Sequence, residues 1–107
     1  MLFRSFSDDL AEAIHIILNA SKKKIYNICG NSFPIINIGT GDIYSIKQLA
    51  NIIAKKIGYQ GKIFFNNKYP NGVIKKDVDC SRIKKFNWIP KINLNHGLDI
   101  VLKELKL

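Results

Sequence analysis

The sequence contains no apolar run long enough to cross a membrane. A transmembrane helix needs roughly 20 consecutive apolar residues, and no stretch of this chain approaches that length. The first residues, MLFRSFSDD, lack the continuous apolar centre of a secretory signal. We therefore expect a cytoplasmic protein without a membrane partner.

Cysteine and histidine are too few and too scattered for a metal site or a disulfide framework. The two cysteines, Cys29 and Cys80, lie far apart and belong to no CxxC pair. Two such thiols in a chain without a secretory signal are typical of reduced cytosolic cysteines. His15 and His96 have no acidic or cysteine neighbour at ligand spacing. We expect surface or packing roles for both histidines, and no metal.

Acidic residues are scarce as well. The sequence has 8 acidic and 17 basic residues, which gives a formal net charge of +9. A nucleic-acid partner is one interpretation of that excess. However, only Arg4 and Arg82 are arginines, and no cluster combines arginine with interleaved aromatics. An AT-rich coding sequence would produce the same excess of Lys, Ile and Asn, so nucleic acid is not the expected partner.

What the sequence does contain predicts one small domain with helices. Its 107 residues are 47% hydrophobic, enough to form a core but short for a complete cofactor-using enzyme. Apolar periodicity predicts helices over residues 7–21, 46–57, 82–86 and 94–105. Their expected N-caps are Ser7, Ser45, Ser81 and Asn93.

Two of these helix starts have further signals. Gln48 follows Ser45 at capping-box spacing, and Gly58 is placed to end the same helix. Asp8 and Asp9 stand in the first turn of the first helix. There they stabilise the positive helix end, and as adjacent residues they point in different directions. We therefore do not interpret them as a catalytic carboxylate pair.

Short strands are predicted over residues 35–38 and 62–65, where β-branched and aromatic residues gather between turn residues. Residues 22–32 and 66–76 are predicted loops, the second with the turn sequence YPNG. Trp88 is expected to anchor the last helix by packing. The expected fold class is α/β, in the looser form of an α+β fragment with short strands and about four helices.

The GTG sequence at 39–41 invites comparison with a phosphate-binding loop. A dinucleotide fingerprint requires a third glycine, but that position is Tyr44, and the Gly-Lys-Ser/Thr of a P-loop is absent. Glycine supplies the positive φ that a tight turn between a strand and a helix requires. We interpret Gly39 and Gly41 as turn residues rather than as a nucleotide site.

Three segments carry a family resemblance: FSDDLAEAI, INIGTGDIYSIKQLANIIAKKIGYQGKIFF and YPNGVIKKDVDCSRIKKFNWIPKINLNHGL. In this order, from residue 6 to about residue 98, they resemble the C-terminal part of GDP-L-fucose synthase. That family belongs to the extended short-chain dehydrogenases/reductases, also called NAD-dependent epimerases/dehydratases. The intact family converts GDP-4-keto-6-deoxy-mannose to GDP-L-fucose by epimerisation and reduction with NADPH.

The resemblance implies a substrate-binding lobe without its catalytic domain. In the family, an N-terminal Rossmann domain binds NADP and carries the Ser, Tyr and Lys of the reductase centre. This chain has no complete glycine fingerprint, and Tyr44 and Tyr69 are followed four residues later by Gln48 and Val73 rather than Lys. We therefore expect residues 1–107 to form a single partial domain that has no catalytic residue and binds no cofactor alone.

The resemblance places three substrate-binding residues in one loop. The family usually reads Pro-Asp-Gly-Thr-Pro-Arg-Lys where this chain has PNGVIKK. The sugar-nucleotide-contacting Asp of the family corresponds to Asn71, and its Arg-Lys pair corresponds to Lys75 and Lys76. A Lys ammonium attracts a pyrophosphate but lacks the fork of Arg. A further substrate-contacting Arg of the family aligns with Leu2, two positions from Arg4.

Several hypotheses about partners remain open at this stage. A GDP-sugar is the expected ligand and should bind weakly to the chain alone. A separately encoded Rossmann-domain chain or a homodimer is a possible assembly, and an inactive relic of a split gene is another interpretation. The alternative is a small basic interaction or nucleic-acid-binding module without sugar chemistry.

Overall fold

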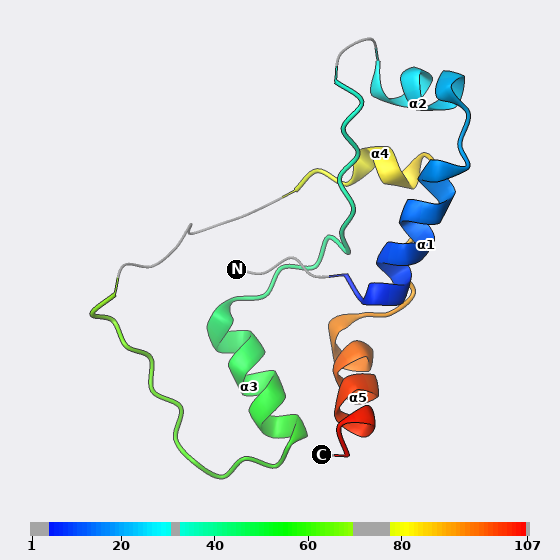
Figure 1. Cartoon of the computed structure of the whole chain (residues 1–107). Coiled ribbons are helices and arrows are strands. Elements are labelled where there is room, and N and C mark those ends of the chain that lie inside the picture. Colours follow the sequence, from blue (N-terminus) through cyan, green and yellow to red (C-terminus); the bar gives the residue numbers. More distant parts are fainter. Residues whose placement is uncertain (1–4, 31–32, 70–77, 107) are drawn as a thin grey trace.

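The helices account for most of the regular structure. A computed structural model describes residues 5–30, 33–69 and 78–106. Five helices lie in these residues (Figure 1): α1 (Ser7–Leu18), α2 (Lys22–Cys29), α3 (Ile46–Lys56), α4 (Ser81–Lys84) and α5 (Leu94–Glu104). The α-rich character of the predicted fragment is confirmed.

The predicted capping box at the start of α3 is present. The Gln48 N–H donates to Ser45 Oγ at 3.1 Å, and the Ser45 N–H donates to Gln48 Oε1 at 2.8 Å. The predicted end of α3 is also confirmed, since Gly58 has φ +67°. The N–H groups of Gly58 and Tyr59 return to the carbonyls of Lys55 and Ala54, the pattern of a Schellman motif. Local sequence thus fixes both ends of α3.

The starts of the other helices follow the prediction in part. Asn93 caps α5, because its Oδ1 accepts the His96 N–H at 2.9 Å. Ser7 and Ser81 were wrongly predicted as caps, because each is the first residue of its helix. At α4 the capping oxygen comes instead from Asp79, two residues before Ser81.

Helix α2 replaces a predicted loop. Ser21 caps it by accepting the Lys24 N–H at 3.2 Å. The three lysines at its start resembled loop sequence, but Ile25, Ile28 and Cys29 share one face, as helical spacing places them. Ile25 and Ile28 pack on the core, and this tertiary contact stabilises a helix of only eight residues.

The two predicted strands do not form a sheet. Residues 35–38 and 62–65 belong to no β-ladder, and within the described residues only Tyr44 makes an isolated bridge. A strand needs a neighbouring strand to receive its backbone hydrogen bonds. The prediction of strands was therefore wrong for this chain by itself. The β-branched and aromatic side chains on which it was based are present in both segments.

The core lies where α1, α4 and the residues after α4 meet. Its buried cluster consists of Ala13, Cys80, Ile83, Phe86 and Trp88. Trp88 is only 2% exposed, so its packing role is confirmed. Its buried neighbours come from α1 and from the residues in and around α4, not from the last helix as predicted.

A buried carboxylate ties α1 to the segment that precedes α5. Asp9 is 3% exposed, and its Oδ2 accepts the N–H groups of Lys91 and Ile92 at 3.0 and 2.9 Å. Lys91 Nζ also pairs with Glu12 at 2.5 Å. The Glu12 carboxylate raises the pKa of Lys91 by accepting its hydrogen bond. Asp9 is therefore more than the helix-end charge that the sequence predicted.

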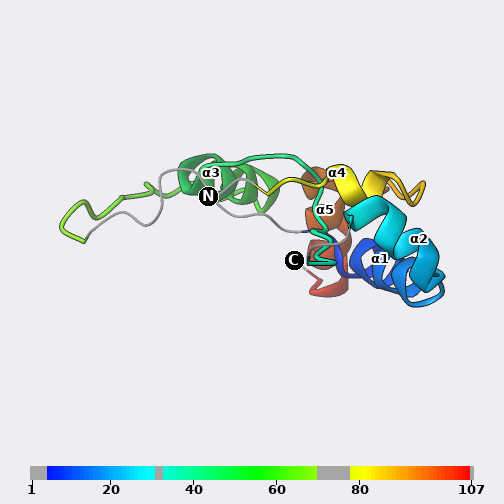
Figure 2. The same ribbon diagram turned by 90° about the horizontal axis from the view of Figure 1, so that it is seen from above.

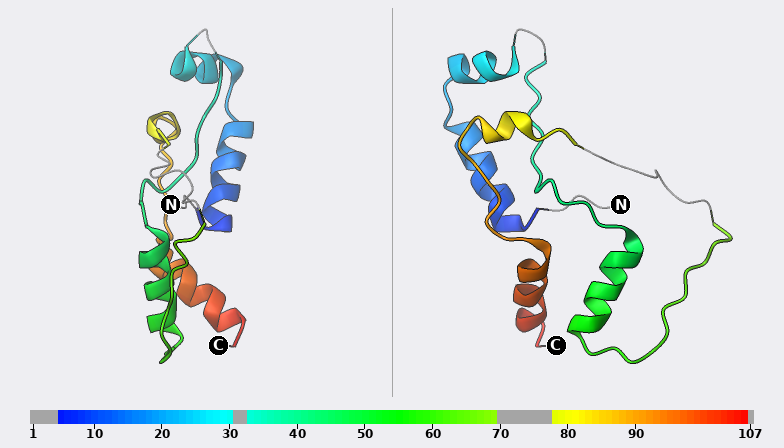
Figure 3. Two further views of the ribbon diagram at one scale, coloured as in Figure 1. Left: turned by 90° about the vertical axis from the view of Figure 1, so that its left-hand side faces the viewer. Right: turned by 180° about the vertical axis from the view of Figure 1, so that it is seen from behind.

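The chain spreads into a thin plate rather than a sphere (Figure 2). Its extents are 54 × 34 × 15 Å and its radius of gyration is 17.4 Å, whereas a compact chain of this length has roughly 13 Å. The accessible surface is 8551 Å², against roughly 6,100 Å² for a compact monomer of this mass. The rear view in Figure 3 shows α3 and the chain after it set apart from α1, α2 and α4.

Candidate functional site

The predicted substrate loop is described only at its two ends. Asn71, Lys75 and Lys76 all lie in the stretch 70–77, which is outside the described residues. The placement of these three side chains therefore stays a prediction. What the structure shows is how the chain is held immediately before and immediately after them.

After the loop, hydrogen bonds from the side chains of Asn37 and Asp79 hold the chain. Asn37 Nδ2 donates to the Asp79 carbonyl at 3.2 Å. The Asp79 carboxylate accepts the Ser81 N–H at 2.8 Å. That bond, with a further one from the Ser81 side chain, lowers the pKa of Asp79. The C-terminal end of the loop thus leads directly into α4 and the core.

Arg82 in α4 connects the chain after the loop to the C-terminal end of α2 and to the residues that follow α2. Its guanidinium donates to the carbonyls of Cys29, Phe33 and Ile35 at 3.3, 3.4 and 2.7 Å. The Cys29 carbonyl is at the C-terminal end of α2, where a cation is favoured by the helix dipole. Sequence reasoning missed this role, although Arg82 is one of only two arginines in a lysine-rich chain.

Before the loop, the chain has few contacts. Asn66 Oδ1 accepts the Lys68 N–H at 3.0 Å, a local Asx-type turn. Tyr69, the last described residue before the loop, is 73% exposed. Every residue from 57 to 69 is exposed. The chain is therefore held by side-chain hydrogen bonds after the loop and is exposed to solvent before it.

The turn at 39–41 uses its hydrogen-bonding groups internally. Gly41 has φ +80°, the left-handed conformation that favours glycine. The Asp42 N–H donates to Thr40 Oγ1 at 3.2 Å. At the following helix start, the Ser45 side chain occupies a donor that a phosphate-binding helix would offer to its ligand. The arrangement fits a structural turn and does not fit a dinucleotide cradle.

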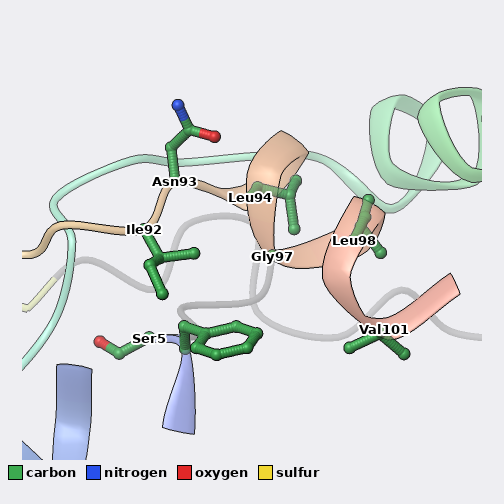
Figure 4. Close-up of a pocket in the computed structure, with 8 residues that line it drawn as sticks. Ser5, Ile92, Asn93, Leu94, Gly97, Leu98 and Val101 are labelled. Carbon is green, nitrogen blue, oxygen red and sulfur yellow. The ribbon is translucent and has the colours of Figure 1, made fainter. Parts of the chain in front are cut away.

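A small apolar pocket lies between the start of the described chain and α5 (Figure 4). Its volume is about 170 Å³. Its lining consists of Ser5, Phe6, Ile92, Asn93, Leu94, Gly97, Leu98 and Val101. A Cβ on Gly97 would lie 2.9 Å from the Phe6 ring, so the glycine permits this close approach. A glycine inside a helix is the sequence signal that marks such a contact.

A second, more polar pocket lies between α3 and α5. It is lined by Ile52, Lys55, Lys56 and Asn95, with a volume of about 440 Å³. Lys56 also forms an ion pair with Asp99, which links the two helices. With its own carboxylate partner, Lys56 is less available to an anion than an unpaired lysine would be. The pocket is thus mainly a seam between α3 and α5.

The remaining candidates from the sequence have structural placements. Cys29 and Cys80 are buried. His15 and His96 are exposed, as expected for surface residues. Over residues 5–30, 33–69 and 78–106, no three His, Cys, Asp or Glu side chains gather as metal ligands. In the same ranges, no helix is long and apolar enough to span a membrane.

Comparison with curated proteins identifies several of similar sequence. The chain is 36% identical over 92 residues to GDP-L-fucose synthase of Escherichia coli, covering 85% of this chain and 28% of that protein. It is 31% identical over 91 residues to "Probable GDP-L-fucose synthase 1" of Oryza sativa, with 85% and 25% covered. It is 30% identical over 93 residues to GDP-L-colitose synthase of Yersinia pseudotuberculosis, with 87% and 28% covered.

These relatives are named as synthases of GDP-linked sugars and belong to the short-chain dehydrogenase/reductase family. Within that family, the chain is similar to GDP-L-fucose synthases and matches a C-terminal fragment of them. The chain spans about a quarter of the length of the curated relatives that it matches. No family model and no solved structure matches the chain.

Proposed function

We propose that the chain is the GDP-sugar-binding lobe of an enzyme of the GDP-L-fucose synthase type. In this proposal, Asn71 hydrogen-bonds the sugar nucleotide, and Lys75 and Lys76 attract its pyrophosphate. The carrying observation is the 36% identity to the Escherichia coli enzyme over 85% of this chain. The substrate class is that of the relatives, whose names specify GDP-L-fucose and GDP-L-colitose.

The anchoring of the loop supports this assignment. A binding loop needs a rigid base, because a loose one loses affinity to the entropy of ordering. Asp79 and Arg82 supply such a base immediately after the three proposed ligands. Before the loop, residues 57–69 are exposed. A second surface is therefore needed to complete the site.

The proposal assigns the cofactor to that second surface. The relatives imply an NADP-dependent family, and the glycine pattern and internal hydrogen bonds of the turn at 39–41 support a structural role for that turn. We assign NADP binding and the reductase chemistry to the polypeptide that corresponds to the rest of the relatives. This assignment holds whether that polypeptide continues the present chain or is supplied separately. The present chain contributes substrate contacts and no catalytic group.

A calorimetric titration with GDP tests the binding role. Exposed lysines contribute at most ~1 kcal/mol each, so the chain alone should bind GDP only in the high micromolar to millimolar range. Adding the Escherichia coli enzyme without its matched C-terminal region should tighten binding roughly tenfold or more. Lys76→Ala should remove most of that gain. Lys23→Ala, at an exposed lysine on α2, is the matched control and should remove none.

An NADPH assay tests the absence of chemistry in the chain alone. With NADPH and GDP-4-keto-6-deoxy-mannose, the isolated chain should leave the NADPH absorbance unchanged. We expect this because the chain has no complete glycine fingerprint and no Tyr-Lys pair. Steady oxidation above a protein-free blank would contradict it.

A basic interaction module is the second candidate, and one observation favours it. The sequence has no Asp or Glu from residue 13 to residue 41, while α2 begins with three lysines. That distribution leaves one end of the plate positively charged. Titration with heparin separates the two candidates. Tight heparin binding, without a GDP gain in the presence of the second polypeptide, would favour the basic module.

A further inference from the structure

Four lysines form a positively charged surface at the α2 end of the molecule. Lys22, Lys23 and Lys24 make up the first turn of α2, and all three are exposed. Lys85 follows α4 directly and is exposed as well. The Lys24 ammonium lies 5.2 Å from the centroid of the Phe86 ring, so the start of α2 lies against the residues that follow α4. We call these four lysines the α2 patch.

The α2 patch has no carboxylate partner within the described residues, whereas lysines elsewhere in the molecule form ion pairs. The sequence has no Asp or Glu from residue 13 to residue 41 or from residue 80 to residue 98. Lys84 is not counted in the patch, because its charge helps to lower the pKa of Asp79. At the start of α2 the helix dipole adds to the repulsion among the lysines. An anionic partner would relieve this repulsion.

The aromatic rings beside the patch are not free to stack on bases. The Lys22 ammonium lies 5.8 Å from the centroid of the Tyr26 ring, and Phe86 under Lys24 is only 4% exposed. Single-stranded nucleic acid is bound by free aromatic faces together with basic groups. In α4, the Arg82 guanidinium donates to three backbone carbonyls. The patch therefore offers charge without the groups that typically contact bases.

Large exposed apolar side chains flank α2 at both ends. Leu18, four residues before Lys22, is 78% exposed, and Phe33, beyond the other end of α2, is 79% exposed. The Arg82 guanidinium bonds the carbonyls of both Cys29 and Phe33, which holds residue 33 near the end of α2. Figures 1 and 2 show α2 at one extremity of the molecule. Lysines beside exposed Leu and Phe are typical of surfaces that attach to a lipid bilayer.

We propose that the α2 patch binds the surface of a bilayer that contains anionic lipids, with Leu18 and Phe33 entering the headgroup region. A lysine near such a surface strengthens membrane partition about fivefold, and buried apolar area adds to the charge attraction. The expectation of no membrane partner came from the lack of a spanning segment, and a surface contact requires none. The proposal concerns a surface other than the substrate loop and is independent of the GDP-sugar role.

The test measures co-sedimentation of the full chain with lipid vesicles. One set of vesicles is neutral phosphatidylcholine, and the other also contains phosphatidylglycerol. A first triple variant replaces the three lysines of α2 by Gln, and a second replaces them by Arg. The matched control removes the same charge from exposed positions outside the patch, with Lys47→Gln, Lys62→Gln and Lys103→Gln. Because the lysines repel one another at the start of α2, their removal should leave the helix folded, which circular dichroism checks.

The apolar part of the contact needs its own variants. Leu18→Ser and Phe33→Ser are combined in one chain. Phe64→Ser is the control, because Phe64 is 85% exposed and lies outside the α2 end. The double variant should weaken binding to anionic vesicles roughly tenfold, and the control should not weaken it. Equal binding by the double variant and the control overturns the proposed entry of Leu18 and Phe33 into the headgroup region.

The chain should bind anionic vesicles and leave neutral ones in solution, and about 0.5 M NaCl should release it. The Gln variant of α2 should bind anionic vesicles roughly tenfold or more weakly than the lysine control, whereas the Arg variant should retain binding. Equal losses in the Gln variant and the control, or no binding to anionic vesicles, overturn the proposal.

Two further titrations separate this proposal from its neighbours. Binding of polyuridylate that depends on the α2 lysines, without binding to vesicles, identifies nucleic acid as the partner and overturns the bilayer. The GDP gain in the presence of the second polypeptide should be the same for the Gln variant and the unchanged chain. Absence of that gain in the unchanged chain contradicts the GDP-sugar role alone, and vesicle binding then still supports the α2 patch.

Discussion

Two regions of this molecule both form helices with apolar faces, but only one of them buries those faces. The core end consists of α1, α2 and residues 78–93, which include α4, and it contains every buried hydrophobic side chain among the described residues. The α3 arm consists of residues 41–69, and its helix has no buried residue. Yet α3 has the better caps, with a capping box at its start and a Schellman motif at its end. Capping hydrogen bonds and an apolar periodicity are enough to form α3, but its apolar face is buried only where another surface packs against it.

The largest expected effect contrasts an isoleucine from each region. Ile83 at the core end is fully buried, so Ile83→Ala should lower the free energy of unfolding by about 2–5 kcal/mol through lost burial and a cavity. Ile53 in α3 is half-buried, and Ile53→Ala should cost about 1 kcal/mol or less in the isolated chain. Urea midpoints measure both. Equal losses would mean that the two regions share one core.

The next effect concerns the hydrogen bonds by which Asp9 in α1 holds residues 91 and 92. Asp9→Ala leaves the N–H groups of Lys91 and Ile92 without their acceptor, at a cost of about 2–3 kcal/mol. Asp8 is adjacent but exposed, so Asp8→Ala should change stability by about 0.5 kcal/mol or less. If the two alanine variants unfold at the same urea concentration, the buried carboxylate is not the link described here.

In the α3 arm, local turn chemistry should dominate instead of burial. Ser45→Ala removes the N-cap and should cost about 0.5–2 kcal/mol. Gly41→Ala should cost about 1–2 kcal/mol, because φ +80° strains any other residue although no atom blocks the new Cβ. Ser45→Asp keeps a capping oxygen and should restore most of the loss. Denaturant midpoints without ligand report all three, and unchanged midpoints would contradict the turn.

The smallest effect concerns pH. The Ser81 N–H lowers the pKa of Asp79 below its ordinary value of 3.8. The stability that this carboxylate contributes is therefore present above that ordinary value, and it is lost as pH falls through the lower folded-state pKa. Asp79→Asn should flatten the decline of stability between about pH 5 and pH 2. Ser81→Ala, which keeps the backbone donor, should give an intermediate slope, and an unchanged slope in both variants would refute the assignment.

The sequence predicted those parts of the fold that depend on near neighbours. The Ser45–Gln48 box, the Asn93 cap and the Gly58 ending each involve residues within a few positions of one another, and all three are present. Helix α2 was missed because its stability comes from Ile25 and Ile28 on a core that is distant in sequence. The strands were predicted from side-chain preference alone, whereas a ladder requires a second strand.

The candidate site divides in the same way. The family motif placed Asn71, Lys75 and Lys76 in one loop, and that placement lies outside the described residues. The anchors of the loop were not predicted, because Arg82 reaches Ile35 across 47 residues and Asn37 reaches Asp79 across 42. No local pattern encodes contacts of that separation.

Amide hydrogen exchange along the whole isolated chain tests most directly whether the α3 arm is completed from outside. Exchange should be slow in α1, next to the buried core, and roughly a hundredfold faster or more at residues 59–69. Adding the second polypeptide should slow residues 59–69 and leave α1 unchanged. Equally slow exchange in both regions of the isolated chain would contradict completion from outside, because the α3 arm would then be stable without a partner.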